Sequence, residues 1–164
     1  MTESTGQHPV NDEMTALRER VRRLEAAETA RDHIHAYARV LDDPHPDTVT
    51  ALFAADAVLS TPSRQARGTA EIRQFFEWAF AADPSNKRHF VANTRTTWLG
   101  EPRVRVQSQF LFTGRGSARS VIGWGRYDAV VDIAGPAPLF AEMNMAVDVS
   151  TDLVTGWQQD PEAN

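Results

Sequence analysis

The chain has 164 residues, of which 41% are hydrophobic and 24% are charged, and it contains no cysteine. A chain of this length can bury roughly 70% of its unfolded surface as one domain, and the lack of cysteine excludes disulfides, thiolate metal sites and a cysteine nucleophile. The formal net charge of −5 argues against a nucleic-acid-binding module.

The N-terminal quarter is predicted to be helical. Residues 1–12 are polar and lack periodicity, which predicts a flexible tail. After them, apolar residues recur every three or four positions, as in an amphipathic helix. They are Met14, Leu17, Val21, Leu24, Ala27, Ile34, Tyr37, Ala38 and Leu41. This helix, or two helices in tandem, is expected to end near Asp42, because Pro44 and Pro46 follow.

Two shorter helices and a strand are expected next. Residues 48–54 are predicted to form a short helix, and residues 56–61 a strand that ends before Pro62. A second amphipathic helix is predicted over residues 70–82, with Thr69 as its N-cap. No apolar run approaches the roughly 20 residues of a membrane span, and the polar start is unlike a signal peptide. We therefore expect a cytoplasmic protein that binds neither membrane nor nucleic acid.

The second half of the chain has the period of β-strands. Strands are expected over residues 87–98, 103–112, 120–133 and 139–149, separated by turns that are rich in glycine and proline. Helices followed by a series of long strands indicate an α+β fold with one curved antiparallel sheet. Residues 13–149 then form the domain, and residues 150–164 a C-terminal extension.

Histidine is the side chain best suited to proton transfer near neutral pH, and the chain has five. His8 lies in the predicted tail and His45 in a loop between two prolines. His33 and His35 are two residues apart on a helix, so they point about 200° apart and cannot share a metal ion. We expect both of them at or near the surface.

His89 and Asp42 are the two candidates for proton-transfer chemistry. A period of two places His89, Val91 and Asn93 on one face of their strand, so that an imidazole and an amide could contact one bound molecule. A core histidine bonded to a backbone carbonyl is the alternative interpretation. Asp42 falls at the border of the apolar stripe, where a buried carboxylate would need a partner. Alternatively, it is an exposed residue that ends the helix.

Five segments, taken in chain order, carry a family resemblance. They are Tyr37–Asp42 (YARVLD), Leu52–Ala57 (LFAADA), Gly68–Ile72 (GTAEI), Arg88–Asn93 (RHFVAN) and Gly125–Asp128 (GRYD). In this order, the chain resembles the SnoaL-like branch of the nuclear transport factor 2-like superfamily from about residue 15 to residue 149. The resemblance implies a cone-shaped α+β barrel, a cystatin-like roll, in which helices pack in the concave face of a bent antiparallel sheet.

The resemblance also implies a reaction class. Members of this group include polyketide cyclases, scytalone dehydratase, a bile-acid dehydratase and a hexachlorocyclohexane dehydrochlorinase, which use no cofactor. Asp42 and His89 stand where several of them carry a proton-transfer dyad, and Tyr37 stands where a side chain helps to polarise the substrate. We therefore expect a cofactor-independent dehydratase, isomerase or cyclase that acts on a hydrophobic polyketide, terpenoid or steroid-like substrate, with neither metal nor cofactor.

The last strand departs from the family pattern. Dehydratase and dehydrochlorinase relatives tend to carry an arginine there, whereas Met143 stands at about that position. Met143 and Met145, with Phe110 and Phe112, would give a soft apolar wall for a bulky substrate, or they are plain core. Trp124 and Tyr127, on opposite faces of the strand over residues 120–133, are further candidates for substrate contact, and the sequence does not say which of the two faces inward.

Two further functions and a self-association surface fit the same pattern. The chain could be a non-catalytic small subunit of a ring-hydroxylating dioxygenase, because those subunits share the fold and the motifs around residues 89–93 and 125–128. It could also bind a hydrophobic ligand without turnover. The alternating face of Arg103, Arg105, Gln107 and Gln109 suits the interface of a homodimer or other homo-oligomer, or faces solvent.

Overall fold

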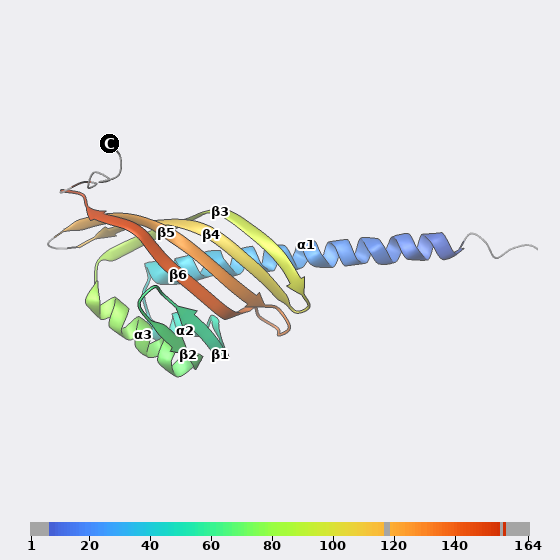
Figure 1. The fold of residues 1–164 in the computed structure, drawn as a ribbon, viewed down its shortest axis with the longest axis horizontal. Coiled ribbons are helices and arrows are strands. Elements are labelled where there is room, and N and C mark those ends of the chain that lie inside the picture. The colour runs from blue at the N-terminus through green and yellow to red at the C-terminus, as the bar shows by residue number, and fades with distance from the viewer. Residues whose placement is uncertain (1–6, 117–118, 155, 157–164) are drawn as a thin grey trace, which may run out of the picture.

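A bent sheet lies over the C-terminal half of one long helix in the computed structural model, which describes residues 7–116, 119–154 and 156 (Figure 1). The helices are α1 (Gln7–Asp42), α2 (Pro46–Thr50) and α3 (Gly68–Ala82). The strands are β1 (Phe53–Ser60), β2 (Gln65–Arg67), β3 (Asn86–Gly100), β4 (Arg103–Arg115), β5 (Ser120–Asp132) and β6 (Leu139–Asp152). Within the described residues, no helix is long and apolar enough to cross a membrane.

The sheet is mixed, which corrects the wholly antiparallel sheet expected from the sequence. Its strand order is β2-β1-β6-β5-β4-β3. β3 to β6 pair antiparallel in succession, as the hairpin turns predict. β1 pairs with β6 in parallel, because α3 and three long strands separate the two in the chain and return β6 in the same direction as β1.

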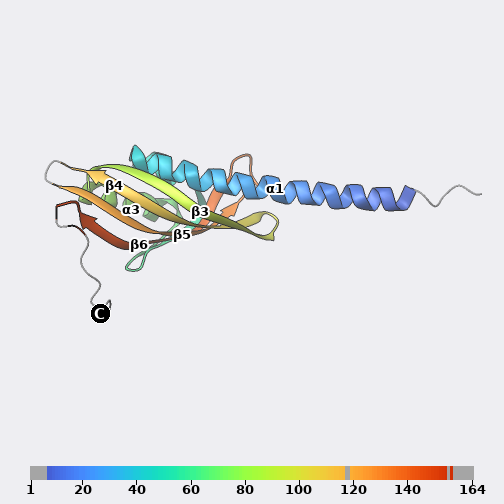
Figure 2. The same ribbon diagram turned by 90° about the horizontal axis from the view of Figure 1, so that it is seen from above.

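The apolar residues of α1 lie on two faces, and not on the single stripe expected. Ala26, Ala30, Ile34, Tyr37 and Leu41 are buried against the sheet. Met14, Leu17, Val21 and Leu24 are exposed. At about 100° of rotation per residue, this second group lies on roughly the opposite side of the helix. Figures 1 and 2 show that the N-terminal half of α1 extends beyond the sheet, which leaves this second group uncovered.

Several predicted boundaries shift by a few residues. α1 begins at Gln7, so residues 7–12 belong to a helix and not to a flexible tail, whereas residues 1–6 and His8's side chain lie outside the described part. α2 begins at Pro46, a favourable first helical position, and ends at Thr50, so that Phe53 opens β1. β6 continues to Asp152, three residues into the predicted extension.

The expected capping of α3 by Thr69 is wrong. α3 begins at Gly68, and Arg67 is its N-cap residue without a side-chain cap. The Glu71 carboxylate instead accepts a hydrogen bond of 2.8 Å from the Arg67 backbone N–H. Arg67 also ends β2, a short strand that the sequence did not predict.

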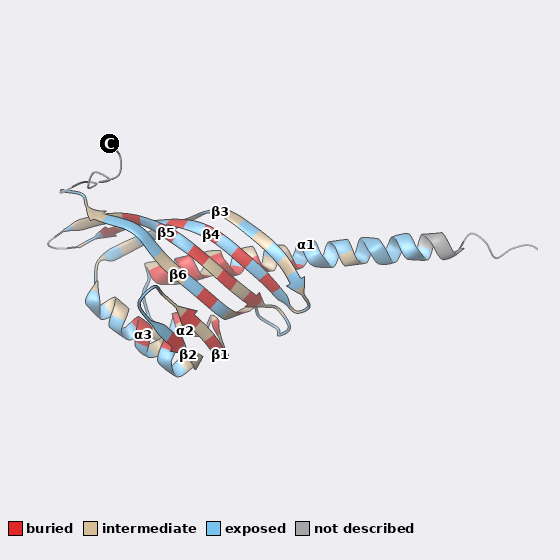
Figure 3. Cartoon of the chain, in the orientation of Figure 1, coloured by how far each residue is buried: buried red, intermediate tan, exposed pale blue. Residues whose placement is uncertain are grey.

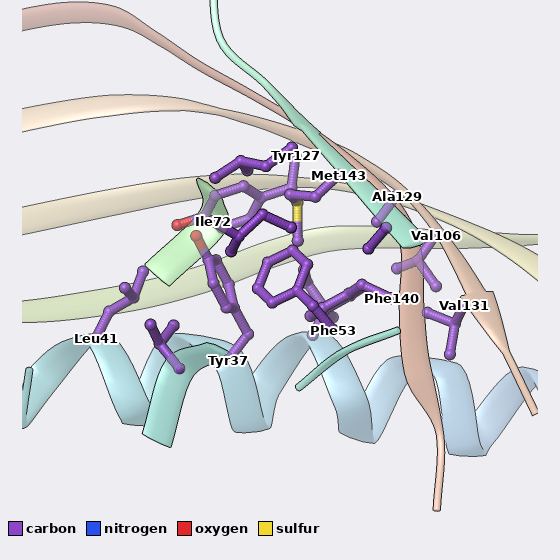
Figure 4. Packing of buried hydrophobic residues seen from close by; sticks show 14 of the residues in the cluster. Tyr37, Leu41, Phe53, Ile72, Val106, Tyr127, Ala129, Val131, Phe140 and Met143 are labelled. Atoms are coloured by element: carbon purple, nitrogen blue, oxygen red, sulfur yellow. The ribbon is translucent and has the colours of Figure 1, made fainter. Parts of the chain in front are cut away.

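The core between α1 and the sheet is rich in aromatic rings. Tyr37 makes edge contacts with Phe53, Phe76, Tyr127 and Phe140, with ring centroids 5.5–6.3 Å apart. These rings come from five different elements, and Figure 4 shows several of them converging above α1. Such edge contacts add to the apolar burial of each ring. Tyr37 therefore joins the helices to the sheet.

Two glycines of β5 allow the rings of β4 to lie across the sheet. Gly123 pairs with Phe112, and Gly125 pairs with Phe110. A Cβ atom at residue 125 would lie 2.1 Å from the Ala146 carbonyl oxygen and 2.6 Å from the Phe110 ring. Glycine is thus required for close approach at this position.

Gly125→Ala is expected to destabilise the protein by about 1–3 kcal/mol, because the added methyl group collides with backbone and ring atoms. The measurement is the free energy of unfolding in urea. Gly135→Ala is the matched control, because its nearest atom would lie 3.6 Å away in ordinary contact. Equal stability of the two variants would contradict the prediction.

Candidate active site

Asp42 and His89 meet where α1 ends beneath β3. Asp42 is the last residue of α1, which ends just before Pro44 and Pro46. Its Oδ1 atom accepts two hydrogen bonds from His89, one of 2.8 Å from the backbone N–H and one of 2.9 Å from ring Nδ1. This arrangement fixes the tautomer with the proton on Nδ1, which leaves Nε2 as the acceptor.

Both members of the dyad are largely buried, since 9% of the His89 side chain and 22% of the Asp42 side chain are exposed. Burial lowers the pKa of His89 below its usual value near 6.5, although Asp42 opposes this shift and nearby Lys87 adds to it. The imidazole is therefore mostly neutral at pH 7, which is the form that can accept a proton.

His89 forms part of the wall of a cavity of about 280 Å³. The cavity lies between the C-terminal end of α1, α3 and the inner face of β3 to β6. Most of its wall is apolar and aromatic. The lining residues are Tyr37, Leu41, Pro44, Phe75, Phe76, Ala79, Phe80, Asp83, Ser85, Lys87, His89, Phe110, Phe112, Tyr127, Met145 and Val147.

Two phenol groups reach this cavity from opposite sides. Figure 4 shows the hydroxyl groups of Tyr37, from α1, and Tyr127, from β5, pointing toward one another. Tyr37 donates only a weak hydrogen bond, 3.7 Å to Met145 Sδ. Burial raises the pKa of both tyrosines. Both therefore stay protonated, as potential donors to an oxygen atom in the cavity.

Phe110, Phe112 and Tyr127 all line the cavity, whereas three other candidates for substrate contact lie elsewhere. Asn93 is exposed and donates a hydrogen bond to Gln109, because a β-bulge between Ala92 and Arg95 interrupts the period of two. The φ of Asn93 is 53°, in the left-handed region. The expectation that Asn93 shares the face of His89 is therefore wrong.

Trp124 and Met143 also lie outside the cavity wall. Trp124 is 41% exposed on the outer face of β5, since Gly123, Gly125 and Tyr127 occupy the inner face. Met143 is fully buried in the core. Met145, the next inward methionine on β6, lines the cavity instead. The open question about the two faces of β5 is thus answered in favour of Tyr127.

Sequence reasoning missed the polar rim and misplaced one histidine. Lys87 forms an ion pair with Asp83 at 3.0 Å, and both line the cavity. Opposite charges four residues apart, on either side of the turn that leads into β3, could have indicated this pair. His33 is buried rather than superficial, with Nε2 3.1 Å from the Leu52 carbonyl oxygen. Burial lowers the pKa of His33, while Leu52 opposes the shift.

Comparison with known families identifies the fold. Residues 22–134 match the profile of the SnoaL-like domain, which is more than half of the chain. The chain belongs to the SnoaL-like family. The resemblance stated from sequence segments is thereby confirmed. No curated protein matches the chain.

Solved structures with the SnoaL-like fold come from several functional classes. A proposed scytalone dehydratase from Novosphingobium aromaticivorans has 20% identity, covering 84% of this chain and 91% of that chain, with a TM-score of 0.72. A hexachlorocyclohexane dehydrochlorinase from Novosphingobium barchaimii has 15% identity, with 85% and 97% covered and a TM-score of 0.71.

The β subunit of a proposed aromatic-ring-hydroxylating dioxygenase from Novosphingobium aromaticivorans is also similar. It has 15% identity, covering 77% of this chain and 91% of that chain, with a TM-score of 0.67. At such identities, these likenesses establish the shared α+β fold. Within the described residues, no three His, Asp or Glu side chains are grouped so that they could hold a metal ion.

The pKa of His89, followed by NMR titration of its ring, is expected below 6.5, because burial disfavours the imidazolium. Asp42→Asn should lower this pKa further, since it removes the charge that opposes the shift but keeps an oxygen acceptor. The assignment is made by comparison with His89→Gln. A pKa above 6.5, or a rise in Asp42→Asn, would contradict the geometry.

Proposed function

We propose that this SnoaL-like protein is a cofactor-independent lyase or isomerase in which His89 is the general acid/base and Asp42 orients it. The observation that carries the proposal is the pair of hydrogen bonds from His89 to Asp42 Oδ1 at the wall of an apolar cavity. Such a positioned base contributes about 10²–10⁴-fold to a proton transfer.

The proton moves through Nε2 of His89. In its neutral tautomer, the ring takes a proton from a carbon atom next to a substrate carbonyl, and Asp42 stabilises the imidazolium that forms. In a dehydration, the imidazolium then returns this proton to the departing hydroxyl group, so that water leaves and a C=C bond forms. In an isomerisation, the proton returns to a different carbon atom.

The two phenols take the part that the missing last-strand arginine would have. Negative charge develops on the substrate oxygen when the carbon proton leaves. Tyr37 and Tyr127 can donate hydrogen bonds to that oxygen, since burial keeps both hydroxyl groups protonated. A substrate oxygen is a better acceptor than Met145 Sδ, the present partner of Tyr37. Met143 contributes to the core and not to this step.

The cavity favours a compact hydrophobic substrate. Its volume of about 280 Å³ lies just below the usual range for ligand pockets, roughly 300–1,000 Å³. Phe75, Phe80, Phe110 and Phe112 supply flat apolar surfaces for a ring system. Within the predicted range of polyketides, terpenoids and steroids, a molecule of one or two rings fits best.

The likeness to a dioxygenase β subunit supports a second candidate, the non-catalytic small subunit. Such a subunit would form a stable complex with an iron-containing large subunit, which co-expression and co-purification would detect. The buried dyad favours the enzyme, because a structural subunit has no need to hold a neutral imidazole against an apolar cavity. A protein that only binds a ligand would show binding without proton exchange.

His89→Ala is expected to lower the rate of proton exchange by about 10²–10⁴-fold. The assay follows deuterium incorporation next to the carbonyl of cyclic ketones in D₂O by mass spectrometry, a step that dehydration and isomerisation share. His45→Ala is the matched control, because His45 lies in an exposed loop outside the cavity. Circular dichroism checks the fold of each variant.

Asp42→Asn separates charge from geometry in the same assay. The asparagine oxygen can still accept both hydrogen bonds from His89, so the fold is retained while the stabilisation of the imidazolium is lost. We expect a reduced kcat, and an acid limb of kcat/KM that moves to lower pH, in line with a lower His89 pKa. Full activity in both Asp42→Asn and His89→Ala would disprove the dyad.

A further inference from the structure

An apolar stripe on the projecting half of α1 has no partner within the described chain. Met14, Leu17, Val21 and Leu24 are 45%, 52%, 44% and 68% exposed. Their spacing of three, four and three residues places them at alternating a and d positions of a heptad repeat. Figure 3 shows this end of α1 as a largely exposed helix beyond the sheet.

The opposite face of the same helix is the one that contacts the domain. Arg22 forms an ion pair with Glu101 in the turn between β3 and β4, at 2.5 Å. The Arg23 guanidinium lies 6.0 Å from the centre of the Trp98 ring. Ala26 is buried. The stripe therefore points away from the domain, into solvent.

The projecting N-terminal part of α1 needs to bury an apolar face to be stable. Isolated helices shorter than roughly 12–15 residues are marginal in water, and most helical stability in proteins comes from burying an apolar face. Residues 11–18 are all exposed, so this part of α1 buries no apolar face of its own. Ion pairs of Glu19 with Arg22 and Arg23 are exposed and contribute little.

The charges beside the stripe complement those of an identical helix. Glu13 and Arg20 occupy the g positions, and Arg18 and Glu25 occupy the e positions. All four are exposed, and none of them has an ion-pair partner within the described residues. When two such helices run antiparallel with Leu17 opposite Val21, Glu13 faces Arg20 and Arg18 faces Glu25 of the other copy. Every flanking pair is then of opposite charge.

We propose that residues 13–25 of α1 bind the same segment of a second copy of this chain as a short antiparallel coiled coil. The stripe ends at Leu24, and the next a position is Glu28. Parallel helices would bring the two Glu28 carboxylates together across the axis. Antiparallel helices keep them at opposite ends of the pair, and they also place the two domains at opposite ends. The proposal is independent of the reaction at His89.

Disulfide trapping tests this pairing directly, because the native chain has no cysteine. Leu17→Cys and Val21→Cys chains are mixed under mild oxidation, and the products are separated by non-reducing electrophoresis. The mixture is expected to form the mixed disulfide dimer in preference to either homodimer, since residue 17 faces residue 21 of the other copy. Ala16→Cys is the matched control, as an exposed residue on the opposite side of the same turn.

Sedimentation of the full chain supplies a second measurement. Leu17→Glu/Val21→Glu is expected to lose one association step relative to the native chain, whereas Ala16→Glu should leave the association state unchanged. The proposal is overturned if Ala16→Cys cross-links as readily as the stripe variants, or if neither stripe variant cross-links and the double glutamate variant sediments like the native chain. That second outcome would assign the stripe to a different protein. Homodimers of Val21→Cys in preference to the mixed product would overturn the antiparallel arrangement.

Discussion

A single carboxylate oxygen joins the helical layer to the sheet at the candidate site. Asp42 Oδ1 accepts hydrogen bonds from both the backbone and the ring of His89, so the same atom fixes where β3 lies against α1 and which ring nitrogen carries the proton. The contact between α1 and His89 of β3 therefore depends on α1 ending at Asp42, and the prolines that follow end the helix there. The position of the imidazole and its tautomer thus both depend on the Asp42 carboxylate.

Around this contact, the cavity has few polar groups and many aromatic rings. Burial among these rings shifts the pKa of the polar groups. Burial makes the imidazole less basic and the phenols less acidic, so a proton acceptor and two proton donors can coexist near neutral pH. Lys87 and Asp83, which also line the cavity, are paired with each other at 3.0 Å. His89, Tyr37 and Tyr127, the groups proposed to exchange protons or hydrogen bonds with a substrate, are therefore neutral near pH 7 before it binds.

The sequence predicted those features that local chemistry determines. The end of α1 and the period of β3 to β5 follow from proline placement and alternation, whereas the pairing of Asp42 with His89 was expected from the family resemblance. It could not predict the bulge that turns Asn93 outward, because a one-residue insertion leaves no mark in the apolar pattern before it. The two apolar faces of α1 could not be predicted either. The spacing of three and four residues continues along the whole helix, although the apolar side of its N-terminal half differs from that of its C-terminal half. Only the position of the sheet distinguishes the residues that it covers from those that it leaves exposed.

Because of the glycines of β5, the cavity can be changed by substitutions on β4 more easily than by substitutions on β5. The rings of Phe110 and Phe112 rest on backbone at residues 125 and 123, so no side chain lies beneath them. Shortening either side chain would add its volume to the cavity, and at residue 110 it would also remove a stacking contact with Tyr127, whose ring centroid lies 4.2 Å away. A larger residue at either glycine would instead press on the main chain. Single substitutions on β4 can therefore enlarge the cavity, whereas close contacts with backbone and ring atoms restrict residues 123 and 125 of β5 to glycine.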